Sequence, residues 1–480
     1  MPAKILTSFI DGSWLSPVSK TIVARNPGRL AREASRWSPA SRTQARDAME
    51  AAAQAWPAWA ATRPRGRIEL LDAFLKKLGQ DSSALADTIT RENGKTLRES
   101  RAEIRAALAD ARHLLKSARA AMRRPAPNGS KSRHGLVHEP VGVYMLVTPW
   151  NFPLATIIRK IIPALAFGNT VILKPSRLTP ATAVKVVGLM AEVPFSSGTV
   201  NLVLGTGGGV GPALVGHPAL RGLSFTGSNP VGLELARQTA GRDVRLQLEM
   251  GGKNSLIVLA DAGVDQAVEA AITGGFSCAG QWCTGTGRII VEDDLYQLFC
   301  DKLVTRTTQL KVGPGDVQSV QVGPVISADR VRFAKSSVRE AVTAGATIAC
   351  GGDRPALRKG WKGHFFAPTV LTEVTEKMDV FKNELFVPIL PVVRAADYSD
   401  ALRLANSGPY GLSASIFTTD RIRADHFLQH IEAGIAHVNL HTALRIPELP
   451  VAGWRDSGRG IPECGDYAAD FFARPRAVYL

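Results

Sequence analysis

The chain is poor in cysteine and histidine, and this scarcity excludes several kinds of protein. Five cysteines among 480 residues are too few for a disulfide scaffold, and they form no Cys-x-x-Cys pair. The nine histidines are scattered, so no zinc site is indicated. The cysteines occupy positions 278, 283, 300, 350 and 464. We therefore expect no bound metal and a reduced, cytoplasmic setting.

The chain also lacks an uninterrupted apolar run. Its longest apolar tract, residues 140–173, contains prolines, two asparagines, an arginine and a lysine. It cannot supply the ~20 clean apolar residues that a membrane span needs. The first residues show no charged-then-apolar signal pattern. No membrane association is expected.

Acidic residues are fewer than basic ones, which gives a formal net charge of +16. The lysines and arginines are spread along the chain, with modest clusters at 63–67 and 123–134, whereas a nucleic-acid binder usually concentrates them on one element. Two interpretations remain: an arginine-rich solvated surface, or a positive field that attracts an anionic substrate or cofactor. A nucleic-acid partner is not expected.

The order of apolar patterns indicates an α/β fold. Residues 42–108 have helical periodicity, and the Pro/Gly/Ser-rich basic segment 124–135 interrupts it. From 141 to 250, short apolar runs alternate with helical stretches, and a second such series begins at 255. This alternation predicts doubly wound, largely parallel sheets, which bind ligands at the carboxyl ends of their strands.

Two glycine-containing segments are candidates for binding phosphate. GTGGGVG (205–211) follows an apolar strand, but no acidic residue follows about twenty positions later, so a flexible connection is the competing interpretation. FTGS (225–228) ends a short strand before a helical stretch with Pro230 in its first turn. That arrangement leaves free N–H groups for an anion, although an ordinary capped helix would look the same.

Charged residues also follow predicted strands. Lys174 and Arg177 in KPSR are either ligand-binding groups at a strand end or two surface cations. Glu249 in LEMGGKN stands at a strand end before two glycines. It is either a solvated turn residue or a positioned base.

Two of the cysteines lie five residues apart in FSCAGQWCTGTGR (276–288). Cys278 lies near the end of the helical pattern 265–276 and is most simply a small buried residue. Cys283 lies among glycine, glutamine and threonine, where an incoming carbonyl would have clearance. No histidine neighbours either thiol in sequence. Cys283 is thus a candidate nucleophile, and a structural cysteine is the alternative.

Taken in order, the motifs TPWNFP, KPS, FTGS, LEMGGK, GQWCT and NELF resemble the NAD(P)-dependent aldehyde dehydrogenase superfamily. The resemblance extends from FIDGSW (9–14) to the tail. It implies a cofactor domain (1–117 and 141–251), a catalytic domain (252–450) and a β-hairpin oligomerisation arm (118–140 and 464–480). Within that arm, 124–135 would form a protruding hairpin. Such an arm serves both homodimers and homotetramers.

The resemblance also implies roles for individual residues. Cys283 would be the catalytic thiol, Asn151 the oxyanion donor and Glu249 the base that activates water. NAD or NADP would be the cofactor, with Lys174 at the adenosine ribose, Ser228 at the pyrophosphate and Glu384 at the nicotinamide ribose. The complete set of expected cofactor-binding residues is Trp150, Lys174, Ser176, Arg177, Gly227, Ser228, Glu384 and Phe386.

The sequence departs from the family pattern at three motifs. Arg177 stands where the family often has a glutamate that would repel a 2′-phosphate, so we predict that NADP is used at least as well as NAD. Val387 replaces a glycine of the nicotinamide loop, and PVAG (450–453) replaces P-F-G-G at the substrate funnel.

The substrate is predicted from two residues. Arg159 coincides with an arginine that succinate-semialdehyde dehydrogenases use to bind the distal carboxylate, although their second arginine is Ser277 here. LEMGGKN and DYAADFF are more similar to 2-oxoglutarate-semialdehyde dehydrogenases. We predict a small anionic semialdehyde, and an aromatic or apolar aldehyde packed on Trp282 is the alternative. Two other classes remain open, a non-catalytic basic binding protein and a CoA-acylating dehydrogenase, but the presence of Glu249 favours water as the acceptor.

Overall fold

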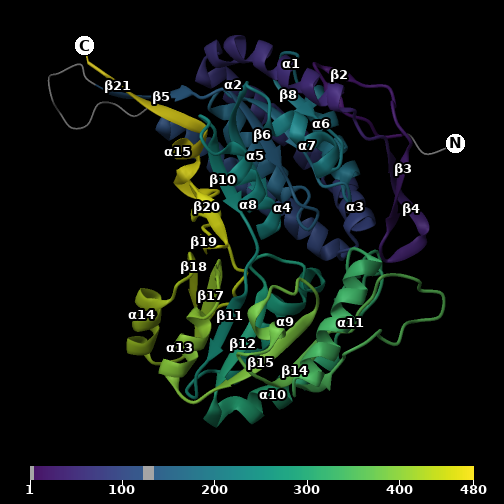
Figure 1. Ribbon diagram of the computed structural model, residues 1–480, viewed down its shortest axis with the longest axis vertical. Helices are drawn as coiled ribbons and strands as arrows, with labels where there is room; N and C mark the ends of the chain where they lie inside the picture. The colour runs from purple at the N-terminus through teal and green to yellow at the C-terminus, as the bar shows by residue number, and fades with distance from the viewer. Residues whose placement is uncertain (1–4, 123–134, 480) are drawn as a thin grey trace.

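Two large β-sheets, each flanked by helices, organise the chain in this computed structural model, which describes residues 5–122 and 135–479 (Figure 1). The first sheet has eight strands in the order β2-β1-β8-β7-β6-β9-β10-β20. Its members are β1 (Phe9–Ile10), β2 (Ser13–Trp14), β6 (Val143–Val147), β7 (Thr170–Lys174), β8 (Val200–Leu202), β9 (Leu220–Thr226), β10 (Arg245–Glu249) and β20 (Gly458–Gly460). The five central strands, from β8 to β10 in this order, are parallel. On one side β1 is antiparallel to β8 and to the edge strand β2, and on the other the edge strand β20 is antiparallel to β10.

Helices cover both faces of this sheet, as the alternation of side chains along each strand requires. In β6, Tyr144 and Leu146 belong to one apolar core, and Val143 and Met145 belong to the other. The first core contains α2 (Pro64–Gln80), α3 (Ser82–Asn93), α4 (Leu97–Ala121), α5 (Ala155–Ala166) and α6 (Pro180–Ala191). On the opposite face lie α1 (Arg42–Ala61), α7 (Gly207–Val215) and α8 (Asn229–Thr239).

The second sheet has seven strands in the order β13-β14-β15-β12-β11-β17-β18. They are β11 (Asn254–Val258), β12 (Thr286–Glu292), β13 (Thr347–Cys350), β14 (Thr369–Val374), β15 (Ile389–Ala395), β17 (Ser413–Phe417) and β18 (Ile435–Val438). Its helices are α9 (Val264–Phe276), α10 (Asp293–Thr308), α11 (Ala328–Thr343), α12 (Asp379–Lys382), α13 (Tyr398–Asn406) and α14 (Arg421–His430). Only β13 at one edge runs antiparallel to its neighbour, so the predicted doubly wound α/β fold is confirmed.

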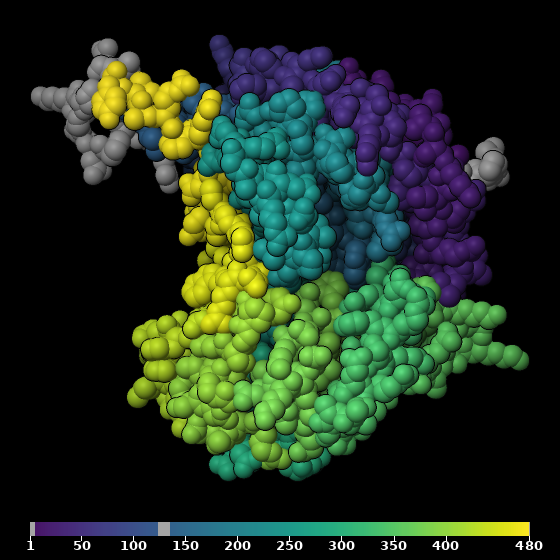
Figure 2. Space-filling view, viewed as in Figure 1, coloured from purple at the N-terminus to yellow at the C-terminus, as the bar shows by residue number. Residues whose placement is uncertain are grey.

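The chain crosses between the two sheets twice. The segment 250–253 joins β10 to β11, and the chain later returns through β19 (Trp454–Arg455) to β20 at the edge of the first sheet. The surface is hollowed where the teal part of the first body faces the green part of the second (Figure 2). The catalytic candidates described below come from loops at this junction.

A separate two-stranded sheet pairs β5 (Gly135–Pro140) with β21 (Ala473–Val478) and projects from the first body (Figure 1). A short helix, α15 (Ala468–Phe472), precedes β21, and α4 continues to Ala121, past the predicted start of the arm at 118. The remaining two-stranded sheets pair β3 (Ile22–Asn26) with β4 (Arg29–Trp37) and β16 (Tyr410–Gly411) with β19. Most of the predicted hairpin 124–135 lies outside the described residues. The domain boundaries and the oligomerising role of the arm stay predictions.

Among the described residues, no helix combines the length and apolar character that crossing a membrane would need.

Candidate active site

A left-handed turn separates α9 from Cys283. Cys278, Ala279 and Gly280 have φ angles of 52°, 56° and 69°. A side chain at position 280 would place Cβ 2.4 Å from the Val387 carbonyl oxygen, so glycine is required there. Each non-glycine residue in this region costs roughly 1–2 kcal/mol. The turn buries Cys278, as expected, and leaves Cys283 partly exposed.

Hydrogen bonds from neighbouring elements hold this strained turn. Glu99 Oε1 accepts from the Cys278 N–H at 2.7 Å. Gln281 donates from Nε2 to the Cys278 carbonyl at 3.0 Å and accepts at Oε1 from the Ile326 N–H at 2.8 Å. Asn254 Nδ2 donates to the Cys283 carbonyl at 2.7 Å. The backbone on both sides of the thiol is therefore fixed before any substrate arrives.

Asn151 lies beside the same turn, in the loop between β6 and α5. Its Nδ2 donates to the Gln281 carbonyl at 3.1 Å, and its side chain is buried. Lys95 Nζ donates to the Asn151 carbonyl at 2.6 Å and to Glu103 Oε2 at 2.8 Å. Glu103 Oε1 accepts from the Leu154 N–H at 2.8 Å. One segment at the start of α4 thus holds both the asparagine loop and the cysteine turn.

Glu249 ends β10, as the sequence predicts, and is buried with Oε2 unpartnered among the described residues. Burial, with the nearby negative charge of Glu463, raises the pKa of its carboxyl well above the ordinary value, and Lys160 opposes this shift only in part. A carboxylate with a raised pKa and a free oxygen is a stronger base towards a water molecule than an ordinary carboxylate.

Burial likewise raises the pKa of the Cys283 thiol to about 11. The Arg159 guanidinium opposes this shift, whereas Glu384 and Glu249 add to it. Without cofactor or substrate, the thiol is therefore largely protonated at neutral pH.

We expect the alkylation of Cys283 by iodoacetamide to accelerate about tenfold per pH unit through the neutral and alkaline range, levelling off near pH 11. The rate follows the thiolate fraction, which grows as the pH rises towards the raised pKa. Mass spectrometry of the labelled peptide measures it, with Cys283→Ala as the blank. A plateau already reached below pH 8 would contradict the effect of burial.

The residues expected to bind the adenosine end of the cofactor lie where the strands of the first sheet finish. Lys174 ends β7, and burial lowers its pKa to about 8. Its Nζ donates to the Pro175 carbonyl at 3.3 Å. Ser176 and Arg177 follow, and the Arg177 side chain is exposed.

The predicted phosphate site has the expected local structure. Ser228 is the N-cap of α8, with Pro230 in the first turn, and its side chain makes no capping bond, so backbone donors there are free for an anion. Gly227 donates its N–H to the Glu249 carbonyl at 3.0 Å. The α8 start and the Glu249 strand end are thereby linked. The competing segment 205–211 forms the beginning of α7, capped by Thr206.

The residues expected at the nicotinamide end are Glu384, Phe386 and Trp150. Burial raises the pKa of Glu384 to about 7, and its Oε1 accepts from the Gly252 N–H at 3.1 Å. A Cβ at Gly251 would lie 2.4 Å from Glu384 Oε2, so glycine permits this approach. Phe386 has a φ of 54°, and its ring contacts Trp150 edge to face at 5.5 Å. Carboxylate, aromatic rings and a free helix start suit the ribose, nicotinamide and phosphate of a dinucleotide.

The two predicted substrate residues are Trp282 and Arg159, and they come from different segments of the chain. Trp282 packs against Phe152, with ring centroids 5.3 Å apart. Arg159, on α5, is mostly buried and lies 3.4 Å from a carboxylate oxygen of Asp110 and of Glu463. Burial would lower its pKa, but Glu463 and other acidic neighbours reverse the effect, so the group stays charged.

Several charged residues beside these candidates were not predicted from the sequence. Lys160 follows Arg159 inside an apolar helix, which is an anomaly that could have signalled a paired charge. The others come from distant segments and give no local signal. They are Lys95, Glu103, Asp110, Arg445 and Glu463.

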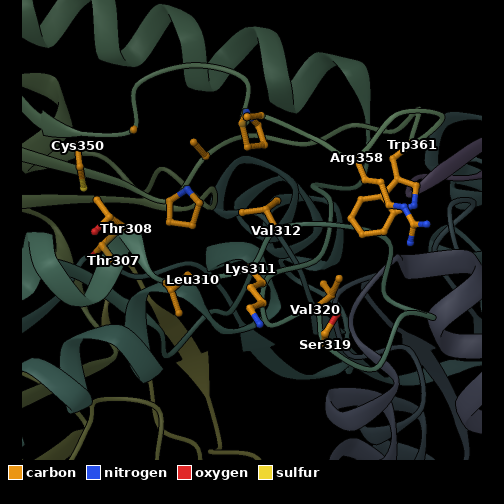
Figure 3. A pocket seen from close by; sticks show the side chains of 15 residues that line it. Thr307, Thr308, Leu310, Lys311, Val312, Ser319, Val320, Cys350, Arg358 and Trp361 are labelled. Carbon is orange, nitrogen blue, oxygen red and sulfur yellow. The ribbon is translucent and has the colours of Figure 1, made fainter.

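A separate cavity of about 470 Å³ lies on the second body (Figure 3). Arg358 and Trp361 line one end and Cys350 the other. None of the predicted site residues lines it. Within residues 5–122 and 135–479, no group of three or more His, Cys, Asp or Glu side chains could hold a metal.

Comparison with known proteins identifies the family of this chain. The profile of the aldehyde dehydrogenase family matches residues 14–478. An alpha-ketoglutaric semialdehyde dehydrogenase of Bacillus subtilis is 32% identical, over 98% of this chain and 97% of its own. An NADP-dependent succinate-semialdehyde dehydrogenase of Escherichia coli is 34% identical, over 94% and 93%. The crystal structure of a betaine aldehyde dehydrogenase from Staphylococcus aureus in complex with NAD+ superposes with a TM-score of 0.94 at 32% identity, covering 98% of this chain and 94% of that one.

The fold and the gathered thiol, amide and carboxyl groups define a dinucleotide-dependent oxidoreductase of the α/β class. The chain belongs to the aldehyde dehydrogenase family and is an NAD(P)-dependent aldehyde dehydrogenase.

Proposed function

We propose that this enzyme oxidises a small anionic ω-semialdehyde to the dicarboxylic acid, with Cys283 as the nucleophile. The observation that carries the proposal is the turn that fixes Cys283 partly exposed beside the Asn151 amide, with Glu249 near enough to influence the thiol's pKa. The names of the relatives support the substrate class, since they act on alpha-ketoglutaric and succinic semialdehydes.

In the first half-reaction, the Cys283 thiolate attacks the aldehyde carbon, and the carbonyl π electrons move to oxygen. Asn151 Nδ2 and the Cys283 N–H donate to this oxyanion, and losing one such donor costs ~100–1000-fold in rate. Lys95 and Gln281 contribute by holding the asparagine loop in place. When bound, NAD(P)+ supplies the acceptor for the hydride, whose departure leaves a Cys283 thioester.

Glu249 serves the second half-reaction. Its free oxygen accepts a proton from a water that attacks the thioester carbonyl. The tetrahedral adduct then collapses, the C–S bond breaks, and the acid leaves while the thiolate is regenerated. The raised pKa makes the carboxylate a stronger base for this step, and the carboxyl then releases the proton to solvent.

For the cofactor, we propose that Lys174, Ser176 and Arg177 bind the adenosine ribose end, and that Gly227 and Ser228 bind the pyrophosphate. Glu384, Phe386 and Trp150 would hold the nicotinamide end. The free helix start at Ser228 and the close approach of Glu384 to Gly251 support this assignment. We also propose that the projecting β5–β21 pair contacts another copy of the chain in a homodimer or homotetramer.

Replacing Arg177 with glutamate is expected to lower the ratio of kcat/KM for NADP to that for NAD by about 10–100-fold. A hydrogen bond between charged groups contributes ~1.5–3 kcal/mol, and each 1.4 kcal/mol is tenfold. Steady-state kinetics with both cofactors measures the ratio, and Arg421→Glu, a highly exposed arginine on α14, is the matched charge control. An unchanged ratio would remove Arg177 from cofactor selection.

A panel of aldehydes tests the substrate class. We expect kcat/KM for succinic semialdehyde to exceed that for benzaldehyde by at least about tenfold, and Arg159→Ala to raise KM for the semialdehyde alone. The alternative is an aromatic aldehyde stacked on the Trp282–Phe152 pair. A preference for benzaldehyde that Arg159→Ala leaves intact would favour that alternative. Release of free acid without CoA separates hydrolysis from acyl transfer to CoA.

A further inference from the structure

Arg159 belongs to a buried cluster of five charged side chains. Asp110 lies between two arginines, with Arg159 Nε at 3.4 Å and Arg445 Nη2 at 2.5 Å. Glu463 lies between Arg159 Nη1 at 3.4 Å and Lys160 Nζ at 2.7 Å. The three cations come from α5 and from the loop after β18, which are far apart in sequence.

The cluster holds one more positive than negative group, three cations against two carboxylates. Glu249 is a further carboxyl close enough to interact with Glu463 and Lys160, and burial with the charge of Glu463 raises its pKa, which disfavours its charged form. The side chains of Asp110 and Glu463 are each only 3% exposed, so water screens this excess poorly. Such a cluster is complementary to one additional monoanion.

Arg445 keeps a donor for that anion, because its Nη1 is buried and makes no hydrogen bond within the described residues. Arg159 Nε, in contrast, faces the carboxylate of Asp110. Asp110 fixes the two guanidinium groups relative to each other through its shared carboxylate. Two neighbouring guanidinium groups, one of them with an unused N–H donor, suit a carboxylate, which accepts several N–H bonds at once.

The cluster is also placed within reach of the reaction. Arg159 lies on the helix that follows the Asn151 loop, and it is the main positive influence on the Cys283 thiol. The side chains of Arg159 and Arg445 are 13% and 19% exposed, so the arginines, unlike the carboxylates, reach solvent. The carboxylate at the far end of an aldehyde bound at Cys283 can therefore bind to both arginines.

We propose that Arg445 is the second guanidinium of the site that binds the substrate's distal carboxylate, with Arg159 as the first and Asp110 as the residue that positions them. This inference rests on the proposed function. It assigns to the loop after β18 the second arginine that Ser277 does not supply.

The test compares succinic semialdehyde with butanal, which has the same carbon chain without the carboxylate. For Arg445→Met we expect KM for succinic semialdehyde to rise about 10–100-fold, with kcat for butanal within about twofold of the parent. Arg445→Lys, which keeps the charge, should recover part of the loss. Arg421→Met, which removes one positive charge at a highly exposed position, should change neither substrate.

The outcomes separate the two claims. If the parent enzyme shows no preference for succinic semialdehyde over butanal, the proposed substrate class fails and the inference falls with it. If the parent prefers the semialdehyde but Arg445→Met keeps its KM, only the inference is wrong. If Arg445→Met lost equal activity with both aldehydes and kept its melting temperature, the excess positive charge would act on the Cys283 thiolate and not on the substrate carboxylate. That result would also overturn the inference.

Discussion

Replacing Cys283 with alanine is expected to lower kcat for aldehyde oxidation by at least about 10,000-fold. The thiol forms the covalent bond on which both half-reactions depend, and removing a nucleophile of this kind abolishes nearly all turnover. Formation of NAD(P)H with excess aldehyde measures the effect. Circular dichroism and a thermal melt verify that the variant is folded.

Cys278 is the matched control, because it is a free thiol in the left-handed turn five residues before Cys283. It is buried, and burial raises its pKa still further than that of Cys283. Cys278→Ala should keep kcat within a few-fold and lose about 1 kcal/mol of stability, as is usual for a small buried substitution. If Cys278→Ala were the inactive variant and Cys283→Ala the active one, the assignment of the nucleophile would be reversed.

Replacing Glu249 with glutamine is expected to separate the two half-reactions. The amide cannot accept a proton from water, so hydrolysis of the thioester should slow by about 100–10,000-fold. Hydride transfer does not need this group once the thiolate has formed, so rapid mixing should show a burst of one NAD(P)H per active site. Gln247, on the same strand and buried, offers a control position through Gln247→Glu.

An absent burst combined with slow turnover would mean that Glu249 acts before hydride transfer, as the base for the thiol. Performing the experiment at alkaline pH distinguishes the cases, since higher pH supplies the thiolate without a base. Recovery of the burst there would assign both roles to Glu249.

The fold could be predicted from the sequence because local patterns determine it. The alternation of short apolar runs with helical stretches identified strands such as β7 and β10, whose ends carry Lys174 and Glu249. The helix start at Ser228 was also local, since Pro230 and the preceding glycine are neighbours in sequence. These features depend on residues within one strand or one turn.

The rest of the site depends on contacts between distant segments. Lys95 reaches Asn151 across 56 positions, and Arg445 meets Asp110 across 335. Nothing in either local sequence indicates the partner, because a lone charged residue in a helix or loop is usually solvated. The left-handed turn at Cys278 and Ala279 could not be predicted from the sequence either, since neither residue type favours that conformation.

The covalent step itself can be observed directly by mixing Glu249→Gln enzyme with NAD(P)+ and succinic semialdehyde, followed by acid quenching and peptide mass spectrometry. The account predicts a succinyl group on the peptide that contains Cys283, in an amount equal to the NAD(P)H burst. A burst of NAD(P)H with Cys283 unmodified, or with the acyl group on another residue, would contradict it.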